Sequence, residues 1–145
     1  MNHSTSLFEY VHYHRVRYRE CDPMGVVYHT HYIDYFENAR TEALRSIGLP
    51  YREIEESGVI MPVVDVFVRY HRPAYYDDLL AVVTRFGGIP DLRVPIDYEV
   101  RRSENDDRVA SGRITLCFVD RERNRPVRCP SMVRQVFQQA ALGGE

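Results

Sequence analysis

The chain has 145 residues, a formal net charge of −2 and a hydrophobic fraction of 44%, which suits one globular domain. Such a charge excludes a protein that binds nucleic acid mainly by neutralising phosphates, and no apolar run reaches the roughly 18 residues that span a bilayer. The three cysteines, Cys21, Cys117 and Cys129, form no C-x-x-C pair and indicate neither a disulfide framework nor a zinc knuckle.

The N-terminus and the basic residues narrow the function further. The segment MNHSTSLFEY lacks the basic region and apolar core of a secretory signal, so we expect a cytoplasmic protein with reduced thiols. All 19 basic residues are arginine, which excludes chemistry based on a lysine Schiff base or a lysine general base.

The first third of the chain is predicted to form one strand and one long helix. Alternating side chains from Tyr10 to Glu20 favour a strand that enters a turn at Cys21–Gly25. Between His31 and Ile47, apolar residues recur at three- and four-residue steps, which is typical of a helix with one buried face. Gly48 and Pro50 are expected to end this helix.

The rest of the chain is predicted to be mostly β-structure. Residues 50–56 can form a short helical turn that Gly58 closes, and Ser131 can cap a terminal helix that runs to about Ala141. Between them lie four β-rich runs separated by turns. The runs cover residues 59–74, 79–86, 92–102 and 108–122, with hairpin loops at 87–91 and 105–107.

This order of elements predicts an α+β fold. A meander of long strands after one amphipathic helix implies an antiparallel sheet wrapped around that helix, because neither element can bury its apolar face alone. The outer face and the free edge of such a sheet invite dimerisation.

One acidic side chain, Asp22, lies in the Pro/Gly turn seven residues before His29, near the expected start of the helix. A carboxylate there can act as a base, while free backbone N–H groups at the helix start polarise a carbonyl. The alternative is an Asx turn, in which Asp22 bonds its own backbone next to Pro23. Spacing alone leaves both interpretations open.

Four stretches resemble a known family. They are YRECDPMGVVYHTHYIDYFENAR, VRYHRPAYYDD, ASGRITLCFVD and RPVRCP, and the match from about Val11 to Val133 resembles the hotdog-fold acyl-CoA thioesterases of the 4-hydroxybenzoyl-CoA thioesterase and YbgC-like kind. The resemblance implies one hotdog domain over residues 1–145, with an ordered core from about 10 to 141. It also implies a homodimer, often a tetramer, and hydrolysis of an acyl-CoA thioester without a metal or other cofactor.

The resemblance also implies the catalytic residues. The family's catalytic carboxylate matches Asp22, and the backbone amide that polarises the thioester carbonyl lies near Tyr28 and His29. A histidine at position 29 is typical of the YbgC-like branch. Asp22 is expected either to attack the carbonyl, which forms a mixed anhydride, or to activate a water molecule.

Aromatic, aliphatic and basic residues supply candidates for substrate binding. Tyrosine and valine side chains are expected to line an acyl tunnel, and arginines to contact the phosphates of CoA. The alternatives are ordinary core packing and ordinary solvated arginines. The expected set is Gly25, Val26, Tyr28, Tyr32, Val64, Val66, Arg69, Arg72 and Arg128.

No metal site is expected, although His29 and His31 form an H-x-H pair, because residues two apart on a helix point to different sides. Two other functions stay open. A hydratase or dehydratase of enoyl or 3-hydroxyacyl thioesters would use Asp22 and the His29 side chain as an acid/base pair. A non-catalytic acyl-CoA-binding protein would use the same pocket without turnover.

Overall fold

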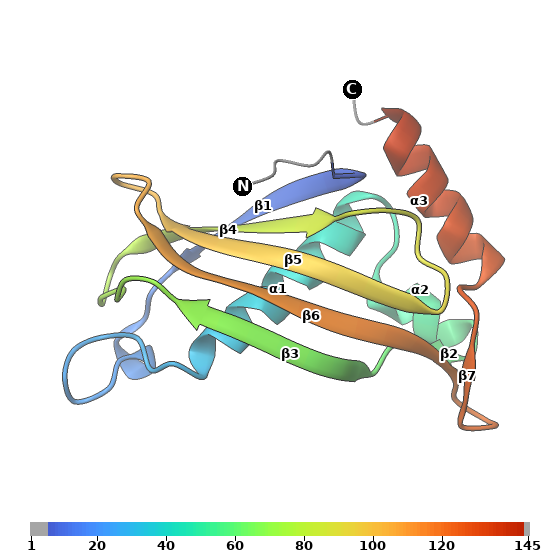
Figure 1. Cartoon of the computed structure of the whole chain (residues 1–145), viewed down its shortest axis with the longest axis horizontal. Coiled ribbons are helices and arrows are strands. Elements are labelled where there is room, and N and C mark those ends of the chain that lie inside the picture. Colours follow the sequence, from blue (N-terminus) through green and yellow to red (C-terminus); the bar gives the residue numbers. More distant parts are fainter. Residues whose placement is uncertain (1–5, 144–145) are drawn as a thin grey trace.

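The computed structural model describes residues 6–143 and consists of an antiparallel sheet wrapped around one long helix, α1 (Figure 1). The strands lie in the order β1, β4, β5, β6 and β3, and the short strands β2 and β7 pair with the last residues of β6. The strands are β1 Phe8–Arg15, β2 Val59–Ile60, β3 Val63–Tyr70, β4 Leu79–Phe86, β5 Arg93–Arg102, β6 Arg108–Asp120 and β7 Arg125–Val127. The helices are η1 Tyr18–Glu20, α1 His31–Ser46, α2 Tyr51–Glu56 and α3 Ser131–Gly143.

The helix α1 confirms the predicted helix to within one residue at its C-terminal end. It ends in a Schellman motif, in which the Gly48 N–H donates to the Arg45 carbonyl and the Leu49 N–H to the Leu44 carbonyl, each at 2.9 Å. Gly48 has a φ of 87°, a value that favours glycine. The buried face of α1 consists of Tyr32, Tyr35, Phe36, Ala39, Arg40, Ala43 and Leu44.

The sheet covers this buried face of α1 with the alternate side chains of its long strands. Phe36 of α1 stacks on Tyr98 of β5 with ring centroids 4.5 Å apart, so helix and sheet share one apolar core. The antiparallel pairing of β4, β5 and β6 confirms both predicted hairpins and the α+β class. Buried side chains of these strands include Leu80, Val82, Phe86, Val94, Ile96, Val100, Ile114, Leu116 and Phe118.

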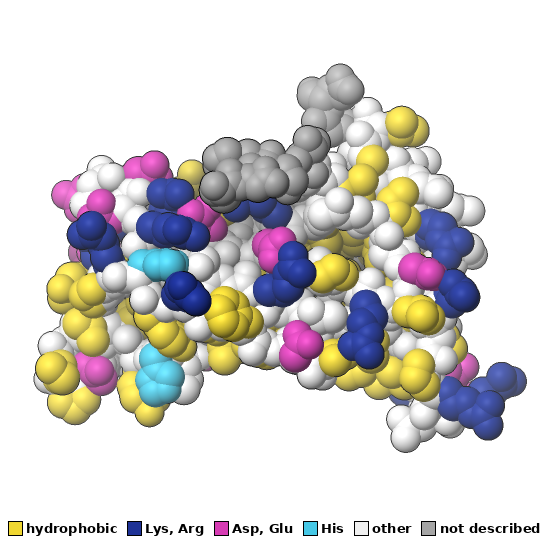
Figure 2. Space-filling view, in the orientation of Figure 1, with side chains coloured by type: hydrophobic (Ala, Val, Ile, Leu, Met, Phe, Trp, Pro, Cys, Tyr) yellow, Lys and Arg dark blue, Asp and Glu magenta, His cyan; other side chains and the backbone are white. Residues whose placement is uncertain are grey.

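The opposite face of the sheet carries charged side chains among apolar ones (Figure 2). Arg113 forms a forked ion pair with Asp97 across the strand boundary, with nitrogen to oxygen distances of 2.7 and 3.0 Å. The carboxylate of Glu99, which is 11% exposed, lies within 3.3 Å of a guanidinium nitrogen from each of three arginines. The three are Arg85, Arg101 and Arg108.

Two predicted strands were wrong in their limits. The first ends at Arg15 rather than Glu20, because the Val16 N–H bonds to the Asp78 carbonyl and the chain then turns into η1. The run 59–74 divides into β2 and β3 at Pro62, since proline has no N–H for the ladder. The terminal helix extends beyond Ala141, and β7 was not predicted.

The strand β3 forms a free edge of the sheet. It pairs with β6 alone, and no other strand among residues 6–143 borders it. Five of its apolar side chains are 41 to 56% exposed, whereas Val68 packs against the core. An edge that is both unpaired and apolar is a ready site for pairing with another chain. These side chains are Val63, Val64, Val66, Phe67 and Tyr70.

Gly112 of β6 allows both the neighbouring strand β3 and the helix α1 to approach β6 closely. A Cβ at this position would lie 2.5 Å from the Phe67 carbonyl oxygen and 2.8 Å from Phe36 Cε2. We predict that Gly112→Ala lowers the free energy of unfolding in urea by about 1–3 kcal/mol, since backbone and core must move apart. The control is Gly87→Ala, whose Cβ would meet nothing within 4 Å. An equal effect of the two substitutions would contradict this explanation.

Candidate active site

Asp22 is held in an Asx turn between η1 and α1. Its Oδ1 accepts hydrogen bonds from the Met24 N–H at 2.9 Å and the Val26 N–H at 3.4 Å, while its own N–H donates to the Val26 carbonyl at 2.8 Å. Gly25, with a φ of 84°, completes the turn. The structure therefore confirms the Asx-turn interpretation for one of the two carboxylate oxygens.

This turn does not exclude chemistry at Asp22. The second oxygen, Oδ2, has no hydrogen-bond or ion-pair partner in the described part of the chain, and the residue is half-buried. A carboxylate that is fixed through one oxygen and free at the other has a defined orientation without losing its basic site. Asp22 can thus hold the loop and still accept a proton or attack a carbonyl.

The structure corrects the expected role of the Tyr28 amide. The Tyr28 N–H donates to the Glu20 carbonyl at 2.9 Å, so this donor is occupied within the chain. Its ring is 46% exposed and packs against His29 at 4.6 Å between centroids. Tyr28 therefore belongs to the loop framework, and the candidate donors to a substrate carbonyl narrow to the amides that follow it.

The His29 N–H is the better donor. A trans peptide directs its C=O and N–H to opposite sides, and the Tyr28 carbonyl of this peptide accepts from the His31 N–H in the first turn of α1 at 3.0 Å. The His29 N–H consequently points away from the helix. Neither it nor the Thr30 N–H has a partner within residues 6–143, and the Thr30 side chain makes no capping bond.

Tyr70 joins the end of β3 to the start of α1. Its hydroxyl donates to the His29 carbonyl at 3.0 Å, and its ring lies edge-on to Tyr32 at 5.5 Å and to His29 at 6.1 Å between centroids. This hydrogen bond connects β3, the strand that carries several of the expected substrate residues, to the loop of Asp22. Sequence reasoning missed this contact because 41 residues separate Tyr70 from His29.

The predicted substrate residues divide into two groups. Val64, Val66 and Arg69 lie on β3, where both valines are 41% exposed, and Arg72 follows on the exposed segment after the strand. Tyr32, in contrast, is 3% exposed and belongs to the core of this chain, so it does not line an open tunnel here.

Arg128 lies apart from the other candidates. It follows β7, which Figure 1 places at the opposite end of the sheet from the start of α1. Its guanidinium pairs with Asp91 at 2.8 Å. The chain therefore does not bring Arg128 together with Asp22, and the RPVRCP motif gave no signal of this distance.

The loop 73–78 packs against the turn of Asp22 and forms backbone contacts with its last residues. Val26 forms an isolated β-bridge with Tyr75, and the Val27 N–H donates to the Ala74 carbonyl at 2.9 Å. Val26 thus bonds both to Asp22 and to this supporting loop. Sequence reasoning placed Val26 near the substrate, and the structure gives it a framework role.

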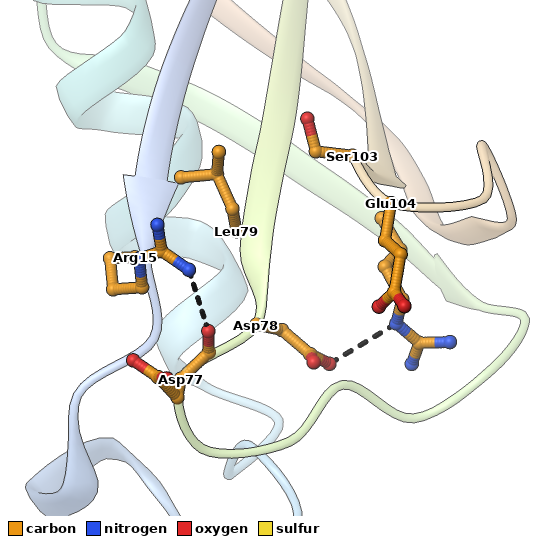
Figure 3. Close-up of a pocket in the computed structure, with 7 residues that line it drawn as sticks. Arg15, Asp77, Asp78, Leu79, Ser103 and Glu104 are labelled. Carbon is orange, nitrogen blue, oxygen red and sulfur yellow. Dashed lines mark hydrogen bonds and ion pairs between the residues drawn. The ribbon is translucent and has the colours of Figure 1, made fainter.

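Arg102 of β5 anchors the supporting loop. Its guanidinium donates to the Pro73 carbonyl at 2.7 Å and pairs with Asp78 at 3.2 Å, as the contact of Asp78 in Figure 3 shows. Arg15 holds the same loop through the Asp77 carbonyl at 2.9 Å. These residues border an open pocket of about 350 Å³, which contains none of the predicted site residues. It is lined by Arg15, Asp77, Asp78, Leu79, Arg102, Ser103 and Glu104.

A second buried group, Glu20, lies two residues before Asp22 and was missed. Its Oε1 accepts from the Arg17 N–H at 2.9 Å and the Tyr35 hydroxyl at 2.9 Å, and lies 3.0 Å from His14 Nε2. Burial opposes ionisation, but the bonds from Arg17, His14 and Tyr35 outweigh it and lower the pKa of the Glu20 carboxyl. The signals in the sequence were an acid close to Asp22 and a histidine on the inner face of β1.

The arrangement is that of a fixed carboxylate with one free oxygen in the same loop as an unpaired helix-start amide. A family model described as the thioesterase-like superfamily matches residues 16–137. The chain belongs to the thioesterase-like superfamily. This membership confirms the resemblance to hotdog-fold thioesterases and the expected enzyme class, thioester hydrolase.

Relatives and solved structures agree with this family. The chain is 32% identical to the acyl-CoA thioesterase YbgC of Haemophilus influenzae over 124 residues, which cover 85% of the chain and 90% of the relative. It is 29% identical to the acyl-CoA thioester hydrolase YbgC of Escherichia coli O6:H1, with coverage of 86% and 92%. The crystal structure of the DHNA-CoA thioesterase from Staphylococcus aureus superposes with a TM-score of 0.85 at 25% identity, covering 93% of the chain and 92% of that protein.

Other features of this thioesterase-family chain concern metals and membranes. Within residues 6–143, no three His, Cys, Asp or Glu side chains are grouped as ligands for a metal ion. The H-x-H pair is divided, because His31 lies 3.3 Å from Asp34 on α1 while His29 packs against Tyr28 and Tyr70. No helix in the described residues is long and apolar enough to cross a membrane.

Proposed function

We propose that the chain hydrolyses acyl-CoA thioesters to the free acid and CoA, with Asp22 as base or nucleophile and the His29 N–H as donor to the thioester carbonyl. The observation that carries this proposal concerns the two oxygens of the Asp22 carboxylate. The turn fixes Oδ1 by hydrogen bonds, whereas Oδ2 has no partner within residues 6–143. The names of the relatives support the acyl-CoA thioester as substrate.

The chemistry needs few groups. The sulfur of CoA leaves as a thiolate whose conjugate thiol has a pKa of about 8.5, so no strong general acid and no cofactor is required. If Asp22 activates water, the water oxygen bonds to the carbonyl carbon, the C–S bond breaks and the proton passes through Asp22 to the thiolate. If Asp22 attacks directly, the C–S bond breaks as a mixed anhydride forms, and water then cleaves the anhydride and supplies the proton that the CoA thiolate takes up. In both routes the His29 N–H stabilises the negative carbonyl oxygen.

The substrate is proposed to lie along the whole of β3. The acyl group contacts Val64 and Val66, which are exposed, and passes the backbone of Gly25 toward Asp22. Arg69 and Arg72 follow on the same segment and supply donors for the phosphates of CoA. Arg128 is left out of this site, because its place beyond β7 and its pair with Asp91 separate it from the others.

A homodimer formed through β3 is proposed as well. The free edge offers unpaired backbone groups and exposed apolar side chains, and a second copy of the strand matches both. The bond from Tyr70 to the His29 carbonyl places the loop of Asp22 at the end of this edge, so a second copy would enclose the substrate. Assembly into a tetramer and a cytoplasmic location stay predictions from the sequence.

We predict that Asp22→Asn abolishes turnover while the protein stays folded. An Asn Oδ1 accepts the same turn bonds, but the amide lacks the basic oxygen, so kcat is expected to fall by about 10²–10⁴. The measurement is thiol release from short-, medium-, long-chain and aromatic acyl-CoAs, with binding of the same ligands measured in parallel. Tight binding by the wild type without thiol release from any of them would favour the non-catalytic alternative.

A second prediction separates the backbone of His29 from its side chain. His29→Ala keeps the N–H and is expected to retain most of the activity, whereas His29→Pro removes this donor and is expected to lower kcat by about 10²–10³. Circular dichroism checks that the proline variant keeps α1. A large loss of activity in His29→Ala would favour the hydratase or dehydratase alternative, in which the imidazole transfers protons.

The dimer proposal predicts that Val66→Arg yields a monomer. A charged side chain in the middle of β3 must lose its hydration when two edges pair, so association is disfavoured. Ile89→Arg is the matched control, since Ile89 is also 41% exposed but lies in the β4–β5 loop. Light scattering after size-exclusion chromatography measures both masses, and a wild type that elutes as a monomer would overturn the dimer.

A further inference from the structure

Glu20 connects three elements through one largely buried side chain, whose Oε1 makes all the contacts. Its Oε1 contacts His14 on β1, Tyr35 on α1 and the Arg17 N–H at the start of its own turn, all within 3.0 Å. The side chain is 12% exposed. The rings of His14 and Tyr35 pack together with centroids 4.4 Å apart, which leaves the carboxylate little freedom to move.

The main chain of Glu20 leads to both parts of the proposed site. Two residues later the chain reaches Asp22, whose carboxylate is fixed by its own turn. On the other side, the Glu20 carbonyl accepts the Tyr28 N–H at 2.9 Å, and the next N–H along the chain is that of His29. A shift of Glu20 therefore moves the base and the carbonyl donor relative to each other.

We infer that Glu20 is a positioning residue, which anchors the loop 21–28 to β1 and α1 and so sets the spacing between Asp22 and the His29 N–H. The inference rests on the proposed function for the roles of these two groups. Reacting groups must lie within a fraction of an ångström of their working positions, and a misplacement of about 1 Å can cost on the order of 10² in rate.

The supporting loop 73–78 does not replace this anchor. It holds the far side of the turn, through Val26 and Val27. The near side of the turn also meets this loop, since Tyr18 of η1 lies edge-on to Tyr76 with ring centroids 5.7 Å apart, but within residues 6–143 the Glu20 carboxylate contacts only His14, Tyr35 and Arg17. Loss of the Glu20 carboxylate consequently removes the bonds that tie the turn to β1 and α1, while the loop 73–78, held by Arg102, still contacts the turn.

The test compares Glu20→Ala, Glu20→Gln and Tyr35→Phe by kinetics and by amide hydrogen exchange. Glu20→Ala is expected to lower kcat on the order of 10² with little change in KM, and to speed exchange across residues 21–28 but not in β4–β6. Glu20→Gln keeps an oxygen that accepts from Arg17 and Tyr35, so it should recover most of kcat. Tyr35→Phe removes one donor and should cause a smaller loss.

Glu99→Ala is the matched control. The Glu99 side chain is 11% exposed, close to the 12% of Glu20. Its carboxylate also forms ion pairs, but it lies on the outer face of the sheet. We expect Glu99→Ala to lower the free energy of unfolding without changing kcat at temperatures where the protein is folded. A kcat loss in both variants that follows stability alone would overturn the inference.

The two proposals fail in different ways. Unchanged kcat and unchanged exchange in Glu20→Ala, with Asp22→Asn inactive, would remove the role of Glu20 and leave the hydrolase intact. If the wild type releases no thiol, the hydrolase fails, and exchange alone then decides about Glu20. Faster exchange confined to residues 21–28 would still support the anchor, whereas unchanged exchange would refute it.

Discussion

Burial of one face of α1 is the constraint on which the structure depends. A helix with this apolar face is not stable alone in water, and a sheet with one apolar face must pack that face against another element. The antiparallel strands meet both needs by curving around the helix, with Phe36 stacked on Tyr98 at the centre. Gly112 permits this approach, because any side chain there would collide with Phe36 and with β3.

The site follows from where this packing ends. The start of α1 emerges beside the end of β3, so helix-start amides, the Asx turn and the free edge of the sheet come together. The turn is braced from two directions, by Glu20 toward β1 and α1 and by the loop 73–78 toward Arg102. Rigid surroundings allow a single carboxylate to serve both structure and chemistry.

Features that depend on local patterns were predictable from the sequence. The helix α1, the hairpins and the turn of Asp22 follow from periodicity and from turn-forming residues, and all were found within a few residues. Features that depend on distant partners were not. The short strands β2 and β7 depend on pairing with β6, and the bond between Tyr28 and Glu20 depends on how the loop 21–28 closes, although the proline that separates β2 from β3 was visible in the sequence. Arg128 was assigned to CoA because a motif carries no information on distance through the fold.

The hydroxyl of Tyr70 links the edge strand β3 to His29, the residue whose N–H is proposed to polarise the thioester carbonyl. It donates to the His29 carbonyl, which lies in the peptide directly after the one that carries the His29 N–H. On the proposed mechanism, a shift of β3 would therefore act on the backbone of His29. If a second copy pairs with β3 as proposed, the pairing would then also fix the orientation of the donor at the helix start.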